Sequence, residues 1–166
     1  MGHRYSLAFL TVFDLGPVEA IRVAAETGYD LIGLRFLPAA PTEPAYPILT
    51  DDAVLAEVAA ALADTGVAVA DIEIARLKAE TDVAGFAPFF ERGRRLGARN
   101  VLVAGDDPEE ARLTESFGAL ARLAAGFGLT VDLEFMPWTR VPDLVTARRI
   151  VEAAGERATE IGSAQV

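Results

Sequence analysis

The sequence predicts an α/β fold of about five βα units arranged around one parallel sheet. Short apolar runs alternate with longer, alanine-rich amphipathic stretches, and the predicted strands begin near residues 6, 31, 67, 100 and 130. Strict strand–helix alternation at intervals of 25 to 36 residues is typical of βαβ units. Two architectures fit: an open doubly wound sheet, or part of a (β/α)8 barrel. A whole barrel takes about 250 residues, so 166 residues cannot close one.

The elements follow in order along one domain, residues 1–154. The predicted strands span 6–13, 31–36, 67–74 with an extension to 77, 101–104, and 130–135. The first helix opens at Pro17, which suits the first helical position, and closes near Gly28. Later helices are predicted over 51–64, 83–96, 108–127 and 141–154, three of them followed by a glycine. Residues 155–166 show no periodicity, so we expect a frayed C-terminal tail and no sixth strand.

Composition and charge exclude several classes of function. The formal net charge of −10 argues against a nucleic-acid phosphate track and against binding to an anionic membrane surface. No apolar run reaches the roughly 18–20 residues of a spanning helix, and the N-terminus lacks the pattern of a signal peptide, so we expect a cytoplasmic protein. With no cysteine and one histidine, His3, a metal site would have to use oxygen ligands. Nucleotide-binding glycine motifs are missing, so we expect no nucleotide cofactor and the doubly wound sheet is disfavoured.

Charged residues inside the strands are the most informative feature of the sequence. A buried parallel strand should be almost entirely apolar, yet the third predicted strand contains Asp71 and Glu73 and the fifth contains Asp132 and Glu134. Period-two spacing places each pair of acids on one face, and Arg35 on the second strand follows the same pattern. Burying carboxylates is costly unless they are paired or bound to a cation.

Two interpretations of these charges remain open. In the first, Arg35 neutralises the acids in a structural network, or the polar face is solvated. In the second, the acids hold a hard divalent cation and a sugar-like substrate, and Arg35 binds an anionic group of that substrate. The same spacing places Ile72 and Ile74 together on the opposite face.

Residues in the loops that follow the strands carry weaker signals. Trp138, after the fifth strand, is a candidate for stacking on a sugar ring, although packing on a proline-rich loop explains it equally well. Asp106 and Asp107 follow the fourth strand and are better explained as the start of a helix before Pro108 than as metal ligands.

Three segments carry a resemblance to a known family: residues 32–38 (IGLRFLP), 71–77 (DIEIARL) and 133–139 (LEFMPWT). They resemble the sugar phosphate isomerase/epimerase family, which are xylose-isomerase-like TIM barrels related to endonuclease IV. The resemblance covers about residues 6–154. It implies that Glu134, at the end of strand five, is a metal ligand for Mn²⁺, Mg²⁺ or Zn²⁺. Glu73 and Arg35 match site-facing positions whose roles vary among members.

The resemblance implies a partial barrel, because family members draw further metal ligands from strands six to eight. The function that we expect is metal-assisted proton transfer on a sugar or polyol-type hydroxy-carbonyl compound, with Glu73 and Glu134 as catalytic residues and Arg35 and Trp138 as substrate-binding residues. The alternative is a non-catalytic truncated barrel, either a pseudoenzyme or a binding module. Unpaired edge strands and bare apolar helix faces also predict a homodimer or a higher homo-oligomer.

Overall fold

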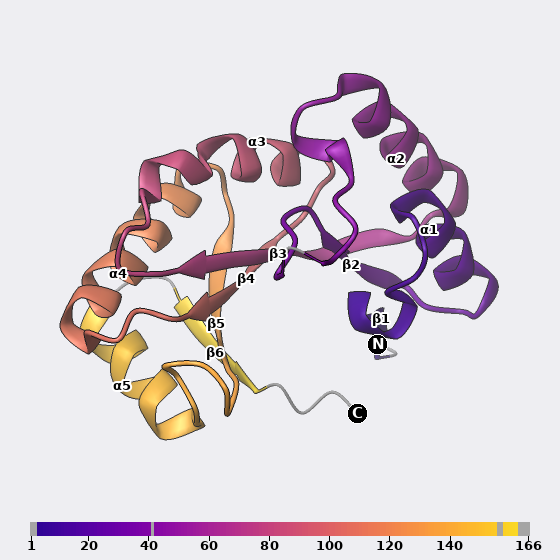
Figure 1. The fold of residues 1–166 in the computed structure, drawn as a ribbon. Coiled ribbons are helices and arrows are strands. Elements are labelled where there is room, and N and C mark those ends of the chain that lie inside the picture. The colour runs from indigo at the N-terminus through magenta and orange to yellow at the C-terminus, as the bar shows by residue number, and fades with distance from the viewer. Residues whose placement is uncertain (1–2, 41, 156–157, 163–166) are drawn as a thin grey trace.

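The chain forms one curved, six-stranded parallel sheet whose strands follow one another in sequence order, β1 to β6 (Figure 1). The computed structural model describes residues 3–40, 42–155 and 158–162. The strands are β1 (Ser6–Leu7), β2 (Leu31–Arg35), β3 (Ala68–Leu77), β4 (Asn100–Gly105), β5 (Thr130–Phe135) and β6 (Ala158–Gly162). The helices are α1 (Pro17–Glu26), α2 (Asp52–Thr65), α3 (Ala87–Arg95), α4 (Glu110–Ala125) and α5 (Leu144–Ala154). Short 3₁₀ helices, η1 (Phe9–Val12), η2 (Pro47–Leu49) and η3 (Val83–Phe86), complete the described elements.

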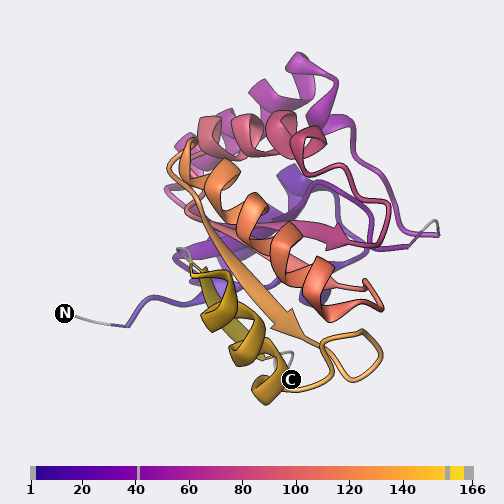
Figure 2. The same ribbon diagram turned by 90° about the vertical axis from the view of Figure 1, so that its left-hand side faces the viewer.

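Sequential strand order decides between the two predicted architectures. A doubly wound sheet reverses its strand order at a switch point and places helices on both faces. Here neighbouring strands are consecutive throughout, and the helices lie around the outer, convex side of the sheet (Figures 1 and 2). The fold is therefore part of a (β/α)8 barrel, and the concave face of the sheet corresponds to the barrel interior.

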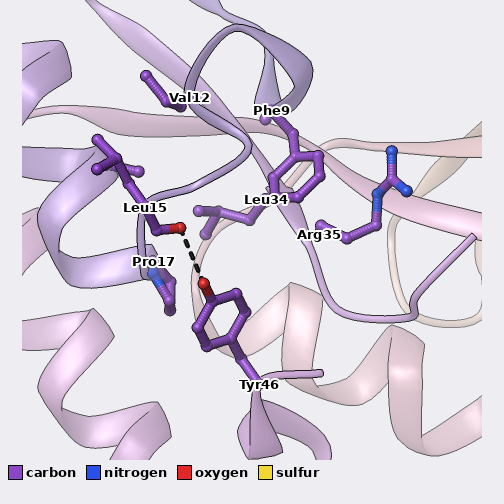
Figure 3. Close-up of a pocket in the computed structure, with 9 residues that line it drawn as sticks. Phe9, Val12, Leu15, Pro17, Leu34, Arg35 and Tyr46 are labelled. Carbon is purple, nitrogen blue, oxygen red and sulfur yellow. Dashed lines mark hydrogen bonds between the residues drawn. The ribbon is translucent and has the colours of Figure 1, made fainter. Parts of the chain in front are cut away.

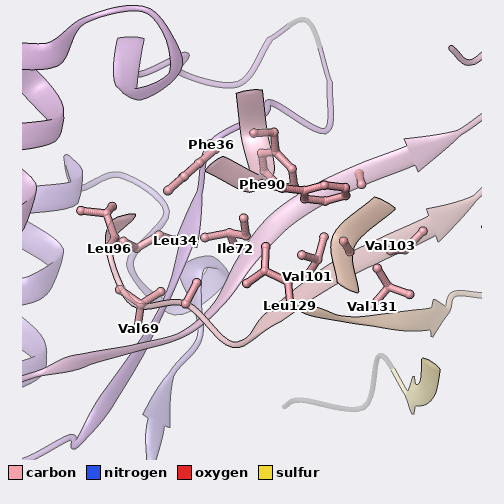
Figure 4. Packing of buried hydrophobic residues seen from close by; sticks show 14 of the residues in the cluster. Leu34, Phe36, Val69, Ile72, Phe90, Leu96, Val101, Val103, Leu129 and Val131 are labelled. Atoms are coloured by element: carbon pink, nitrogen blue, oxygen red, sulfur yellow. The ribbon is translucent and has the colours of Figure 1, made fainter. Parts of the chain in front are cut away.

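The main hydrophobic core fills the layer between the convex face and the helices. Ile72, Val101 and Val131 project from neighbouring strands and are fully buried (Figure 4). Phe90 of α3 packs over them and also contacts the ring of Phe127, with the two centroids 6.0 Å apart. Apolar burial of this kind is the principal stabilising term in a domain of this size, so the convex layer holds the sheet in shape.

Each βα unit ends in the same way before the next strand begins. Five glycines have a positive φ, between 65° and 83°, and stand two or three residues before β2, β3, β4, β5 and β6: Gly28, Gly66, Gly97, Gly128 and Gly155. Such a left-handed residue ends a helix and turns the chain, and glycine adopts it without a Cβ clash.

The first predicted strand, 6–13, is wrong beyond its first two residues. After β1 the chain turns into η1, and the ring of Phe9 lies 4.5 Å from Cζ of Arg35. The apolar character of this segment comes from packing beside a guanidinium group, and a continuous strand could not place Phe9 there.

The absence of a sixth strand was also a wrong expectation. Within the predicted tail 155–166, residues 158–162 form β6, which pairs in parallel with β5 from Val131 to Phe135. A strand pairs through its backbone, so five residues without an apolar run can extend a sheet that offers a free edge. The remaining tail residues, 156–157 and 163–166, lie outside the described part of the chain.

Strand β3 changes face partway along its length. Its register against β4 shifts between Ile72 and Ala75. As a result Ile74 does not accompany Ile72 into the main core but packs in a separate small cluster with Ala104 and Met136. An irregularity of this kind re-aims the side chains that follow it, which period-two counting cannot foresee.

Within the residues that the structure describes, no helix is long and apolar enough to cross a bilayer.

Candidate functional site

The charged side chains predicted from the strands come together on and beside the concave face of the sheet. Gly33 lies opposite Asp71 in the β2–β3 ladder, and Arg35 lies opposite Glu73. On β5, Glu134 lies opposite Ala104 of β4. We call the following set the concave-face cluster: Arg35, Glu43, Asp71, Glu73, Arg76, Asp106, Asp132 and Glu134.

Arg35 is the centre of the best-defined contacts in this cluster. Its Nη1 donates to Oε2 of Glu43 at 2.7 Å, and its Nη2 donates to Oε2 of Glu73 at 3.0 Å. The Phe9 ring lies against the guanidinium, and the arginine side chain is only 5% exposed. The arginine thus ties together the segments after β1 and β2 and strand β3 itself.

Glu43 was not singled out from the sequence. It belongs to the loop between β2 and η2, and its Oε2 also accepts a hydrogen bond from the backbone N–H of Ala39 at 2.8 Å. A glutamate in a proline-rich loop gives no sequence signal, because the partner that explains it, Arg35, is defined only by the folded loop.

Opposing electrostatic effects act on the carboxyl group of Glu73. Burial raises the pKa of its carboxyl group, the charge and hydrogen bond of Arg35 lower it, and nearby Glu43 raises it, with an overall upward shift. Arg35 binds Oε2, whereas Oε1 makes no hydrogen bond within the described part of the chain. One oxygen is thus fixed by the arginine and the other is free to accept a proton.

Asp71 lies on the same face, beside Gly33, and is half-buried. A Cβ at position 33 would come within 2.8 Å of Oδ1 of Asp71, so the glycine provides the space that this carboxyl group occupies. Burial, and then the charges of Glu73, Asp132 and Glu134, raise the pKa of Asp71 to about 7. Asp71 is therefore partly protonated at neutral pH.

Asp132 is buried and accepts a hydrogen bond from Nδ2 of Asn100 on β4, at 2.7 Å. The asparagine offsets part of the cost of burying this acid. Asn100 had no sequence signal of its own, since its position at the start of β4 became meaningful only with the register against β5.

Arg76 and Asp106 form the second ion pair of the cluster, through Nη1 and Oδ2. Asp106 was predicted to belong to a helix start, but α4 begins at Glu110. Asp107 is buried, bonds to the backbone N–H of Glu109 and pairs with Arg112, which agrees with a role in the turn before the helix.

Glu134 is half-buried and has no hydrogen bond or ion pair within the described residues. Burial and the charge of Glu73 raise its pKa, against smaller effects of Arg35 and Arg76. Such a carboxylate is a suitable ligand for a hard cation. However, no group of three Asp, Glu or His side chains within the described residues is placed to hold a metal ion. These residues therefore do not form a metal centre by themselves.

Trp138 lies beyond the end of β5 and is 75% exposed, so it stands at the rim and does not pack on its own loop. Lys78, after β3, is exposed as well. His3 is exposed and lies near the N-terminus, before β1.

A small apolar pocket lies between η1, α1 and β2 (Figure 3). Its wall includes Phe9, Leu34 and Tyr46, whose hydroxyl donates to the carbonyl oxygen of Leu15 at 3.1 Å. The free volume of about 10 Å³ has room for one water molecule at most. A sugar-sized ligand therefore cannot bind there.

No family model and no curated protein matches the sequence. Solved structures do match. A xylose isomerase domain-containing protein from Salmonella typhimurium LT2 aligns with a TM-score of 0.76 and 16% identity, over 95% of this chain and 59% of the other. D-psicose 3-epimerase, solved in the presence of D-fructose, gives 0.73 and 14%, over 96% and 63%. The IolI protein with a bound zinc atom gives 0.71 and 16%, over 94% and 61%.

The chain thus spans about three fifths of the length of these structures. At such low identity the likeness shows the fold alone, which is that of xylose isomerase-like TIM barrels. It confirms the resemblance drawn from the three sequence segments at the level of fold.

Proposed function

We propose that the concave-face cluster binds a sugar-type hydroxy-carbonyl compound and moves a proton on it, as a sugar isomerase or epimerase does. The fold is that of xylose isomerase-like barrels, in which this face is the interior. Solved neighbours include an enzyme named as a D-psicose 3-epimerase, which supports a ketose as the first substrate to test.

One observation carries the proposal: Asp71, Glu73 and Glu134 interact on one face, and all three carboxyl groups have raised pKa values. A carboxyl group whose pKa is raised by burial is a stronger base than an ordinary carboxylate and is therefore better suited to accept and return a proton. Structural acids of a solvated face would keep their ordinary pKa values.

The proposed chemistry divides between two glutamates. Glu73, with Oε2 held by Arg35, accepts the proton from the carbon beside the carbonyl group through Oε1, which leaves an enediolate. Glu73 gives the isomer when it returns the proton to the neighbouring carbon on the same face and the hydroxyl proton moves to the former carbonyl oxygen. The epimer would require a second acid that donates a proton to the original carbon from the opposite face. Glu134, at the same end of the site, holds the substrate oxygens through its raised-pKa carboxyl group, and Trp138 covers the sugar ring from the rim.

A divalent cation belongs to this proposal only with additional ligands. Glu134 would be one ligand, and the cation would stabilise the charge on the substrate oxygens. The other ligands would come from a second copy or from residues outside the described part, because the described residues contain no three-ligand group.

The absence of a three-ligand group among the described residues favours a second candidate function, that of a barrel segment that binds polyols without turnover. The two candidates share the binding face and differ in whether a proton leaves carbon. A test must therefore measure binding and proton exchange separately.

The first experiment measures binding of D-fructose by calorimetry and exchange of its carbon-bound protons with ²H₂O by NMR, with and without Mn²⁺. The variants are Glu73→Gln and Glu134→Gln, and Glu57→Gln on the exposed face of α2 is the matched control. We expect exchange to fall at least a hundredfold in Glu73→Gln while binding changes little. Calorimetric binding of Mn²⁺ that is lost only in Glu134→Gln would support the cation.

Each outcome separates the candidates. Binding without exchange in the wild-type protein would favour the non-catalytic module. No binding of the ketose in any form of the protein would overturn both.

We also propose that the chain self-associates. β1 and β6 are the outer strands of the sheet, and Tyr5, Leu10, Trp138 and Val145 expose 64% to 75% of their surface. Free strand edges and exposed apolar side chains are commonly covered by association. Sedimentation equilibrium at micromolar concentration tests this, and a monomer there would contradict it.

A further inference from the structure

We infer that the concave-face cluster takes an uncharged polyhydroxy ligand, and that Glu43 excludes the phosphate ester of the same sugar by occupying Arg35. The inference rests on the proposed function, since it names the substrate class for that site. It also reverses the initial hypothesis that Arg35 binds an anionic substrate group.

The positive charge of Arg35 is already balanced by two carboxylates, and the one guanidinium nitrogen without a hydrogen-bond partner among the described residues, Nε, is buried. Both of its terminal nitrogens bond to carboxylate oxygens, those of Glu43 and Glu73, at 2.7 and 3.0 Å. Recognition of a phosphate by arginine normally uses two parallel N–H donors on one fork. Here each terminal nitrogen already serves a different acid, and the side chain is 5% exposed.

Arg76, the other arginine of the cluster, is engaged as well, because its Nη1 pairs with Asp106. Lys78 and Arg140 are exposed in the loops after β3 and β5, where solvent and salt screen their charges. The cationic groups that reach the face are thus already neutralised by acids of this chain.

The surrounding acids would repel an anion. Within the described residues, Asp71 and Glu134 form no ion pair, and Arg35 and Arg76 only partly offset the effects that raise the pKa of Glu134. An anion placed at Arg35 would face these carboxylates in a partly buried region, where like charges interact more strongly than in water. Hydroxyl groups of a neutral sugar, in contrast, can donate hydrogen bonds to the same oxygens.

Glu43 is the residue that determines, in this inference, whether the site excludes the phosphate ester of the sugar. Glu73 is fixed on strand β3, but Glu43 comes from a loop and is held by Arg35 and by one backbone N–H, that of Ala39. Its side chain is 16% exposed, so it stands between the arginine and solvent. Removing this carboxylate would free Nη1 and leave a space of the size of a small anionic group beside it.

The experiment compares three probes by calorimetry: D-fructose, D-fructose 6-phosphate and inorganic phosphate. The variants are Glu43→Ala, Glu43→Gln, which removes the charge but keeps the volume, and the double variant Glu43→Ala/Arg35→Met. Glu57→Ala on α2 is the matched control, and circular dichroism with thermal unfolding checks that each variant is folded.

We expect the wild-type protein to bind D-fructose at least tenfold more tightly than D-fructose 6-phosphate. We expect no measurable binding of inorganic phosphate. Glu43→Ala should raise the affinity for both phosphates about tenfold, Glu43→Gln by less, and the double variant should lose the gain. The gain should shrink as salt is added, because it is electrostatic.

Two results would overturn the inference: tighter binding of the phosphate ester by the wild-type protein, or a parallel change for fructose and its ester in Glu43→Ala, which indicates a loosened loop. If fructose does not bind, the proposed function fails. In that case the binding of inorganic phosphate still tests the role of Glu43. Binding that appears only in Glu43→Ala supports the exclusion of phosphate by Glu43, and binding that is the same in the wild-type protein and in Glu43→Ala contradicts it.

Discussion

The two faces of the sheet are built from the same strands but have different roles: the convex face packs into the hydrophobic core, and the concave face carries the candidate site. On the convex face, Ile72 and Val101 are fully buried beneath helices in one continuous apolar core. On the concave face, the neighbours of Ile72 along β3 are the acids Asp71 and Glu73, and the apolar side chains form only a small cluster around Ile74. In the part of β3 before its register shift, residues of the hydrophobic core therefore alternate with residues of the candidate site.

This contrast explains how a strand can carry two buried acids and remain stable. The free energy that favours folding comes from the convex layer, where burial is complete. The concave face lowers stability, since its carboxyl groups are desolvated and only partly compensated. Truncation of an apolar side chain should therefore lower stability most on the convex face, whereas removal of an unpaired carboxylate charge from the concave face should raise it.

The largest effect is expected on the convex face. Phe90→Ala removes a fully buried ring that packs on Phe86, Phe89 and Phe127. We expect a loss of about 3–5 kcal/mol in the free energy of unfolding, measured with urea. Met136→Ala, in the small concave cluster, is the matched truncation and should cost clearly less; equal losses would break the contrast between the faces.

Asp71→Asn should instead stabilise the protein above neutral pH. The pKa of Asp71 rises from 3.8 to about 7 on folding, so between these values the unfolded chain loses a proton that the folded protein keeps. The contribution of Asp71 to stability is complete near pH 4, is lost as the pH rises toward 7, and remains lost above it. We expect the variant to gain on the order of 2 kcal/mol at pH 8 and almost nothing at pH 4.

Urea unfolding at both pH values tests this, with Asp64→Asn on the exposed surface of α2 as the control. A gain of equal size at pH 4 and pH 8 would show that volume or hydrogen bonding, and not ionisation, is responsible.

The parts of this contrast that the sequence could predict are those set by local patterning. Strand 130–135 was located to the residue, and the acids of β3 and β5 were assigned to one face from their spacing alone. Features that depend on tertiary contacts could not be predicted. Ile74 changes sides because the β3–β4 register shifts, and β1 stops early so that Phe9 can pack on Arg35.

The residues of the candidate site fall into the same two groups: those that local patterning predicts and those that depend on tertiary contacts. Arg35, Glu73 and Glu134 follow from periodicity, since a charge on a buried strand is conspicuous. Glu43 is an acid in an irregular loop, and such acids are ordinarily solvated. Its bond to Arg35 depends on a path of the chain that residue types do not specify.

The smallest effect on stability is expected at the rim. Trp138 is 75% exposed, so Trp138→Ala should change the free energy of unfolding by no more than about 0.5 kcal/mol. If it covers a bound sugar, the same variant should weaken D-fructose binding severalfold in calorimetry. Val145→Ala, at an exposed position of α5, is the control, and unchanged binding in Trp138→Ala would remove the tryptophan from the site.

The left-handed glycines that precede β2 to β6 make the fold modular. Each strand–helix unit leaves its helix through the same left-handed glycine turn, and the next strand pairs in parallel with the strand before it. The molecule is thus a structural repeat without a sequence repeat, and a new unit can be added at the free edge of β6 without rearranging those before it.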